Sequence, residues 1–389
     1  MKRILSLVLV ALLTLSVLCF TGCGAVNDSE VSILWSGDGV ATNPNSLINS
    51  MERAMYIKHV EYKHYGANGD SLKQISQAKE ALENGAQILV VELADPTGLL
   101  ASQIVDAAKE KNVPVVFFNS NVSKSVVESY DKCVSIVTDI TSVSDVQGEL
   151  IAEYVKANKD DMDKNKDGKI SAIVKGINLI AEAAVVKANE LLKEEEISVE
   201  IEIKELLEAE LILTADDITA CSVLAELQEK DYNTDKLKTQ FVPIFTVGEN
   251  VDYKSLVLLT RPAIPENLVI GENDSKKVIK NKNKEIKKLA ELNDHYFNNR
   301  FLCDLTAVNE SDLDEMIYTT INVIDAGRIS GTVIEDRDAI SLAVATVVSN
   351  FAKGNNALAD VESKVKDGQI PSVVVDGPFV KVRYTSYSN

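Results

Sequence analysis

The sequence predicts an α/β protein of two lobes, each a doubly wound parallel sheet covered by helices. Strand-like segments such as residues 87–93 and 113–118 are near-continuous apolar runs, and amphipathic helical segments separate them. Strands of parallel sheets are buried on both faces, so they show such runs rather than alternation. The length of 389 residues suits about two domains.

The first elements follow from residue 31 onward. Residues 31–35 (Val-Ser-Ile-Leu-Trp) form an apolar strand, and residues 46–58 carry apolar side chains at helical spacing. A second helix is predicted over 71–84, because Asn84-Gly85 is a typical helix-ending signal.

The alternation then continues to the end of the chain. After the strand 87–93, the helix 96–111 has its apolar residues on one side, and the strand 113–118 follows. The later strands and helices rest on the same two patterns, and Asp376-Gly377 predicts a hairpin turn. The remaining predicted strands are 135–138, 169–175, 198–203, 210–214, 240–247, 331–334, 373–375 and 379–384, and the remaining helices are 143–157, 180–192 and 338–353.

The predicted lobes are discontinuous in sequence. We assign residues 31–138 and 336–371 to an N-terminal lobe, and residues 139–335 and 372–389 to a C-terminal lobe. The C-terminal lobe contains an irregular insertion at 254–314, whose run 276–288 is rich in Lys and Asn. This run is interpreted as a solvated helix face, with a docking patch for an acidic surface as the alternative.

The N-terminus has the features of an export signal. Lys2 and Arg3 precede an apolar stretch, so residues 1–22 are predicted to be a signal peptide. The end of this stretch, Phe20-Thr-Gly-Cys23, is similar to a bacterial lipobox, which makes Cys23 the expected lipidation site and residues 23–30 a linker. We therefore expect a monomer tethered by lipid to the extracytoplasmic face of the cell membrane; an ordinary signal cleaved nearby is the alternative.

Charge and cysteine content exclude several classes of function. A formal charge of -19 argues against a nucleic acid or an anionic membrane as the main partner, and favours a neutral, cationic or protein partner. Cys133, Cys221 and Cys303 are scattered and odd in number, so we expect buried thiols rather than disulfides or zinc ligands. No Ser/His/Asp set, P-loop or GxGxxG motif is present, and we do not expect an enzyme.

The clearest chemical signal is a loop with calcium-ligand spacing. Asp163, Asn165, Asp167 and Ser171 occupy positions 1, 3, 5 and 9, and Gly168 at position 6 allows a sharp turn. Position 7 is Lys169, which can offer its backbone carbonyl while its ammonium points away. An EF-hand would have Glu at position 12, but Val174 stands there. We expect a neighbouring strand to supply this carboxylate, and Glu210 is the best candidate; a solvated turn without metal is the alternative.

These features resemble the galactose/glucose-binding proteins of bacterial ABC importers. The resemblance is extensive between about residues 66 and 175, and it extends to residues 326–333. The segments that carry it are Gln87–Pro96, Asn112–Asn119, Ser129–Lys132, Thr138-Asp139, Gln147–Ile151 and Asp163–Lys169.

The resemblance implies a type I periplasmic-binding fold with three hinge strands, a sugar bound in the interlobe cleft and a structural calcium ion. The family's calcium ligands correspond to Asp163, Asn165, Asp167, Lys169, Ser171 and Glu210, with Ser171 in place of the usual Gln. Among its sugar ligands, Asn119 matches and Asp216 replaces an Asn. Trp35 is a candidate stacking platform, although it comes earlier than the family's aromatic and could equally be a core residue.

Other ligand positions of the family are altered. Ile180 and Ala184 occupy places where the family has charged residues, and the segment 198–210 is too short for the usual strand, loop and helix. Two functions remain. The first is a lipid-anchored solute-binding protein for a small neutral carbohydrate, which delivers it to ABC permease subunits. The second is a diverged module that docks on a membrane sensor or kinase and has lost tight sugar binding.

Overall fold

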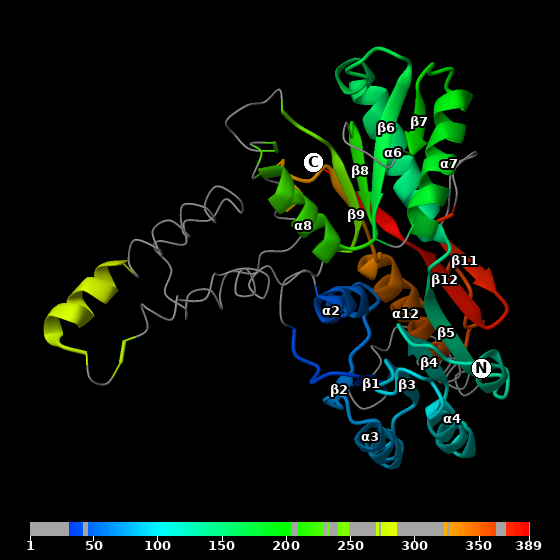
Figure 1. The fold of residues 1–389 in the computed structure, drawn as a ribbon. Coiled ribbons are helices and arrows are strands. Elements are labelled where there is room, and N and C mark those ends of the chain that lie inside the picture. The colour runs from blue at the N-terminus through cyan, green and yellow to red at the C-terminus, as the bar shows by residue number, and fades with distance from the viewer. Residues whose placement is uncertain are drawn as a thin grey trace, which may run out of the picture. The chain divides into compact units, whose positions relative to one another are not determined.

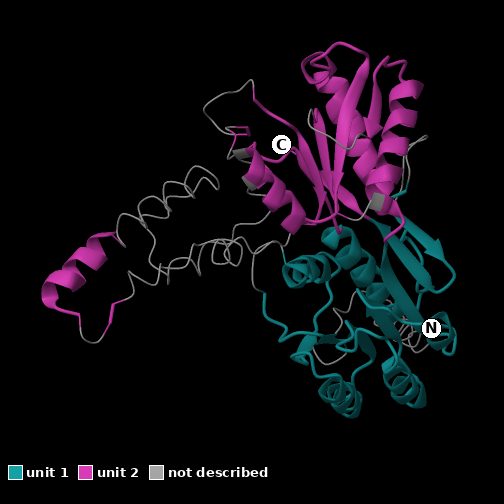
Figure 2. Ribbon diagram, in the orientation of Figure 1, with its two compact units in different colours: residues 1–139, 336–383 teal, residues 140–335, 384–389 magenta. Residues whose placement is uncertain are grey.

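The structure is a computed structural model, and its chain divides into two compact units (Figures 1 and 2). It describes residues 31–41, 46–176, 178–203, 209–228, 230, 232–233, 240–248, 270–271, 274–285, 323–324, 327–362 and 371–388. Unit 1 contains residues up to 139 and residues 336–383, and unit 2 contains residues 140–335 and 384–389. The chain therefore passes between the units three times, after Asp139, Glu335 and Arg383.

Unit 1 is built on a seven-stranded sheet in the order β11-β12-β5-β4-β3-β1-β2. Its strands are parallel except for β11, which is antiparallel to β12. The strands are β1 (Val31–Trp35), β2 (Lys63–Gly66), β3 (Ile88–Val91), β4 (Val115–Phe118), β5 (Cys133–Asp139), β11 (Val373–Asp376) and β12 (Phe379–Arg383).

Helices cover both faces of this sheet, and its central strands β1, β3 and β4 are buried throughout. On one face α2 (Leu47–Ile57) and α12 (Arg337–Ala352) form a core with β1, β3 and β4, and on the other face α3 (Ser71–Glu83) and α4 (Ala101–Glu110) form a second core. The short α5 (Lys124–Val127) precedes β5. Ser46 and Asp70 cap α2 and α3 by accepting hydrogen bonds from the first-turn amides.

Unit 2 has a six-stranded sheet in the order β13-β10-β9-β8-β6-β7, with only β13 antiparallel. Its strands are β6 (Lys169–Lys175), β7 (Glu200–Ile203), β8 (Leu211–Thr214), β9 (Ile244–Val247), β10 (Gly331–Ile334) and β13 (Thr385–Ser388). The helices α6 (Ser142–Met162) and α7 (Asn178–Glu194) pack together on one face, and α8 (Asp217–Gln228) packs on the other.

The two parallel-dominated sheets with helices on both faces confirm the predicted α/β class. The predicted hairpin at Asp376-Gly377 is also present. The predicted lobe boundary at residue 372 is wrong, because β12 pairs in parallel with β5 and places residues 373–383 in unit 1. The strands β2 and β13 were not predicted, since the sequence of neither contains an apolar run.

Several sequence predictions lie partly or wholly outside the described residues. Residues 1–30, which include the signal, Cys23 and the linker, lie outside them, as does Cys303. Within the insertion 254–314, residues 270–271 and 274–285 are described, and residues 276–285 form an exposed helix, as the Lys-rich run predicted. No helix in the described ranges has both the length and the apolar character needed to cross a bilayer.

Candidate functional site

A polar cluster lies at the carboxyl ends of three neighbouring strands of unit 1. Ser36 follows β1, Glu92 follows β3 and Asn119 follows β4. The Ser36 hydroxyl donates to Glu92 Oε2 at 2.6 Å and its amide donates to the same oxygen at 3.2 Å, while Asn119 Nδ2 donates to Glu92 Oε1 at 2.8 Å. Glu92 therefore holds the side chain of Asn119, the predicted sugar-binding residue, in one orientation. The Oδ1 atom and the second N–H of Asn119 remain for other partners.

Asn119 also has an unusual backbone conformation. Its φ is 45°, in the left-handed region that Asn tolerates better than most residues. Its backbone amide donates to the carbonyl of Ile136 on β5 at 3.2 Å, which ties the turn to the next strand. The conformation turns the chain just after β4, so that an exposed amide side chain stands at the edge of a buried sheet.

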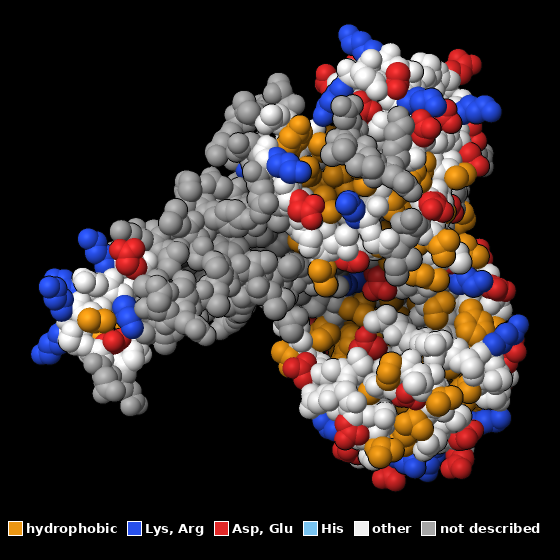
Figure 3. All heavy atoms as spheres, viewed as in Figure 1, with side chains coloured by type: hydrophobic (Ala, Val, Ile, Leu, Met, Phe, Trp, Pro, Cys, Tyr) orange, Lys and Arg blue, Asp and Glu red, His pale blue; other side chains and the backbone are white. Residues whose placement is uncertain are grey.

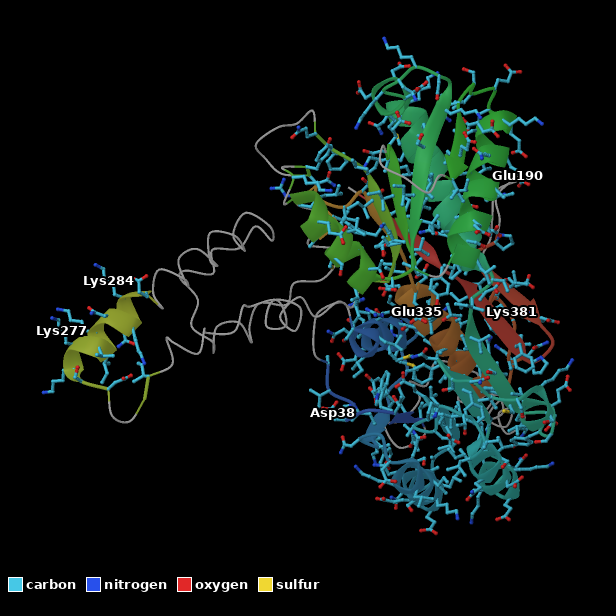
Figure 4. The ribbon with its side chains drawn as sticks, in the orientation of Figure 1. Asp38, Glu190, Lys277, Lys284, Glu335 and Lys381 are labelled. Carbon is cyan, nitrogen blue, oxygen red and sulfur yellow. The ribbon has the colours of Figure 1, made fainter. Side chains whose placement is uncertain are left out.

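A pocket of about 200 Å³ adjoins this cluster. Two acidic residues line the pocket: Glu92, which follows β3, and Asp38 in the loop after β1, which Figure 4 labels. Its lining residues are Trp35, Ser36, Gly37, Asp38, Gly39, Val40, Ser46, Leu47, Ile48 and Glu92. No Lys or Arg is among them, so the pocket offers hydrogen-bond acceptors to a ligand.

Trp35 does not have the exposure that a stacking platform needs. Its side chain is 3% exposed, and its ring makes an edge-to-face contact with Phe118 at 5.4 Å within the core. Its indole nitrogen is buried and has no hydrogen-bond partner among the described residues. This burial favours the alternative that Trp35 is a core residue, which also lines the pocket, and the stacking role stays a prediction.

Asp216 is placed as a helix cap in unit 2. Its Oδ1 accepts from the Thr219 amide at 2.8 Å, and Thr219 Oγ1 donates to its Oδ2 at 3.0 Å. These bonds satisfy the start of α8, which explains an acidic residue at this position without any ligand. The carboxylate is exposed and retains free lone pairs, so a role as a hydrogen-bond acceptor stays a prediction.

The predicted calcium loop is folded around its own acidic side chains. Asp163 Oδ2 accepts from the Gly168 amide at 2.9 Å, and its Oδ1 accepts from the Asp167 amide at 3.1 Å. Asn165 Oδ1 accepts from the Asp167 amide at 2.9 Å, and Asp167 Oδ1 accepts from the Lys169 amide at 2.8 Å. Gly168 has a φ of 80°, which is the sharp turn that the spacing predicted.

Glu210 joins this loop from the start of β8. Its Oε1 accepts from the Lys164 amide at 2.8 Å, and its Oε2 accepts from the Ser171 amide at 2.9 Å. The Glu210 amide in turn donates to the Ser171 carbonyl at 2.9 Å. The side chain is 6% exposed, so a carboxylate distant in sequence is buried beside the loop, as predicted.

The ammonium of Lys169 points away from the loop. It lies 3.1 Å from Glu202 Oε2 on β7, and this hydrogen bond raises the pKa of Lys169. Because the Lys169 ammonium points away, the side-chain atoms that the loop offers as metal ligands are hard oxygens, which fit calcium. Among the described residues, however, no three His, Cys, Asp or Glu side chains converge as metal ligands. The calcium site therefore stays a prediction.

Two features of these units escaped the sequence analysis. Glu92 could have been found, because it directly follows the strand next to that of Asn119, and the carboxyl ends of parallel strands share one edge. The second feature is a pocket of about 700 Å³ beside the loop, where β6, β8 and α8 contribute Ser171, Ile173, Ile212, Val223 and Leu227. The sequence signal for this pocket was the segment 198–210, which is too short for the usual strand, loop and helix.

Two α/β units linked by three crossings, with polar side chains at strand carboxyl ends, define a class of bilobal ligand-binding proteins. A family model for the periplasmic binding protein domain matches residues 41–250, more than half of the chain. The chain belongs to this family. This result confirms the predicted resemblance and the predicted type I periplasmic-binding fold.

Individual relatives cover less of the chain or are more distant. The D-galactose/methyl-galactoside binding periplasmic protein MglB of Haemophilus influenzae is 38% identical over 101 residues, which are 26% of this chain and 30% of that protein. The chain thus matches less than a third of the length of this relative.

The solved structures that match the chain share little sequence identity with it. The arabinose ABC transporter binding protein of Shewanella sp. ANA-3 has a TM-score of 0.43 at 10% identity, and the coverage is 92% of this chain and 91% of that chain. A XylFII-LytSN complex mutant has a TM-score of 0.47 at 12% identity, with coverages of 93% and 98%.

Proposed function

We propose that this chain is a lipid-anchored, extracytoplasmic solute-binding protein that delivers a carbohydrate to an ABC permease. Its family membership supports a binding role rather than catalysis. A galactose-binding relative is 38% identical to this chain over 101 residues, and this match favours a sugar as the ligand. Cys23 would carry the lipid, as the lipobox-like sequence predicts.

The observation that carries this proposal is the Ser36–Glu92–Asn119 cluster of unit 1. A sugar hydroxyl can donate to one acceptor and accept from one donor, and Asn119 offers both kinds of atom. Glu92 fixes the Asn119 amide before any ligand arrives, which reduces the entropy lost on binding. Asp38 at the same pocket adds an acceptor for further hydroxyls.

Calcium would be a structural ion in this function. Asp163, Asn165 and Asp167 with Glu210 would hold it by side-chain oxygens, Lys169 by its carbonyl and Ser171 by its hydroxyl. Three carboxylates in this set would be neutralised by the ion, which would stabilise the link between the end of α6 and the starts of β6 and β8.

Binding can be tested with thermal unfolding and native mass spectrometry of the chain from residue 24 onward. A panel of mono- and disaccharides should contain one that raises the unfolding temperature, since a ligand at 100 times its Kd adds about 2.7 kcal/mol. Glu92→Gln and Asn119→Ala should each weaken that shift. Glu83→Gln, an exposed carboxylate at the end of α3, is the matched control and should leave it unchanged. A chain that responds to no sugar of the panel contradicts the proposal.

A second function is favoured by one observation in unit 2. Ala184, at a position where the predicted family has a charged ligand residue, is completely buried where α7 packs in the core with α6. A buried methyl group at this position presents no polar group to a sugar. A sensor module that recognises a membrane receptor would be consistent with this loss. Copurification with a receptor, together with no response to sugars, would favour this second function.

A further inference from the structure

The helix at residues 276–285 carries four of its five lysines on one face. At about 100° of rotation per residue, Lys276, Lys280, Lys284 and Lys277 fall at roughly 0°, 40°, 80° and 100° around the axis. Lys282 falls at about 240°, on the other side. We call the first four the lysine face. Figure 3 shows the blue side chains gathered on this helix, and Figure 4 labels Lys277 and Lys284 on it.

The four lysines of this face are exposed and available. All of them are classed as exposed, and none takes part in an ion pair with another described residue. Lys282 is different, because its ammonium lies 2.8 Å from Asp274, whose Oδ2 also accepts from the Gly271 amide at 2.9 Å. This ion pair lowers the pKa of Asp274 and fixes the turn before the helix. The fifth lysine is therefore structural, whereas the other four make no ion pair within the part of the chain that the structure describes.

The sign of this face is opposite to that of the protein. Residues 274–285 contain five Lys and two acidic residues, Asp274 and Glu285, which gives 5 − 2 = +3. The whole chain has a formal charge of -19. At physiological ionic strength the Debye length is about 8 Å, so an anionic surface touching the lysine face would be attracted to it while more distant acidic groups are screened.

The chemistry of the face favours lipid headgroups over a protein partner. Its cations are all Lys, which act as point charges, and it contains neither Arg nor an aromatic residue. Specific protein interfaces are enriched in Arg and aromatic residues and depleted in Lys. We propose that the lysine face binds anionic lipid headgroups and holds this segment against the membrane. The proposal takes its setting from the lipid anchor of the proposed function, but the contact itself does not require that anchor.

The test uses vesicle cosedimentation of the chain from residue 24 onward, which contains every described residue. Phosphatidylglycerol vesicles should bind the protein at low salt and release it at about 1 M salt, where the Debye length is about 3 Å. Phosphatidylcholine vesicles should not bind it. Replacing Lys276, Lys277, Lys280 and Lys284 by Gln should lower the partition coefficient on the order of 100-fold or more, because each surface Lys near an anionic bilayer contributes about 1 kcal/mol.

The matched control removes four exposed lysines elsewhere. Lys73, Lys79, Lys111 and Lys193 changed to Gln alter the net charge by the same amount, and the partition coefficient should then stay within about threefold of wild type. No preference for phosphatidylglycerol, or equal losses in both variants, would overturn the proposal. Sugar responses of the same samples are measured in parallel. Sugar binding without vesicle binding refutes only this inference, and vesicle binding without any sugar response refutes only the proposed function.

Discussion

Replacing Glu210 by Gln tests the link between β8 and the acidic loop. The carboxylate accepts from the Lys164 and Ser171 amides at 2.8 and 2.9 Å, and it is buried. Hydrogen bonds to charged groups contribute about 1.5–3 kcal/mol each. Gln retains one acceptor oxygen and turns its NH2 group toward the other amide donor. We therefore expect unit 2 to lose about 2–3 kcal/mol of unfolding free energy without calcium.

Urea unfolding followed by two signals locates this effect. Trp35 is the only tryptophan and lies in unit 1, so its fluorescence reports that unit, while far-UV circular dichroism reports both units. Glu226→Gln, an exposed carboxylate on α8 of the same unit, is the control and should have no effect. A Glu210→Gln variant as stable as wild type in calcium-free buffer would show that these two hydrogen bonds do not hold the loop.

Calcium adds an independent measurement on the same variant. At 100 times its Kd the ion should stabilise the wild type by about 2.7 kcal/mol, and the variant should gain much less because a ligand carboxylate is gone. An equal calcium response in both proteins would exclude Glu210 from the ligand set. No response in the wild type would refute the calcium site altogether.

Three further predictions concern single residues. Gly98 has a φ of 70°, and a Cβ there would clash with the Asn121 carbonyl oxygen, so Gly98→Ala should destabilise unit 1 by at least about 2 kcal/mol in the Trp35 transition. Gly69 has a φ of 77° and open space around it, so Gly69→Ala should cost about 1 kcal/mol. Equal losses in the two variants would contradict the clash. Burial raises the pKa of Cys133 to about 12, so its labelling at pH 8, read by mass spectrometry, should be on the order of 100-fold slower in the folded chain than in urea, and fast labelling of the folded chain would contradict this burial. Burial also raises the pKa of Asp336, so stability is lost as pH rises through the folded pKa of this carboxyl group. Asp336→Asn keeps the helix cap and should be at least as stable as wild type in thermal unfolding at pH 7, and this advantage should be absent below pH 3.8. A clear loss of stability in the variant at pH 7 would refute the reasoning.

Continuous apolar strands explain why most of the fold could be predicted. The near-continuous apolar runs 31–35 and 87–93 contain β1 and β3, because only a strand buried on both faces requires apolar residues at successive positions. β2 and β13 were missed because edge strands can be polar: Lys63 and His64 on β2 are exposed. The boundary at residue 372 was wrong because pairing of β12 with β5 joins residues about 240 apart, which no local pattern encodes.

The candidate site was predictable where spacing alone determines geometry. The loop 163–171 needs only local turns, and its hydrogen bonds follow the predicted positions. Glu210 could be predicted because a parallel neighbour of β6 was the expected source of a distant carboxylate. The fate of Trp35 could not be predicted, since alternate residues of a strand face opposite layers and either layer suited an indole. The Glu92 cluster required knowledge of which strands are adjacent.

The short connection between β7 and β8 links these observations. Only residues 204–210 separate the two strands, whereas a parallel crossover that includes a helix takes at least about 10–12 residues. In the part of the chain that the structure describes, the face of β6 that carries Ser171 and Ile173 lines a pocket, and the connection is too short to place a helix over it. Glu210 stands at the end of this connection and ties it to the acidic loop by side-chain hydrogen bonds. Because this link depends on the two hydrogen bonds that the Glu210 carboxylate accepts, we expect the stability of unit 2, and not that of unit 1, to depend on calcium.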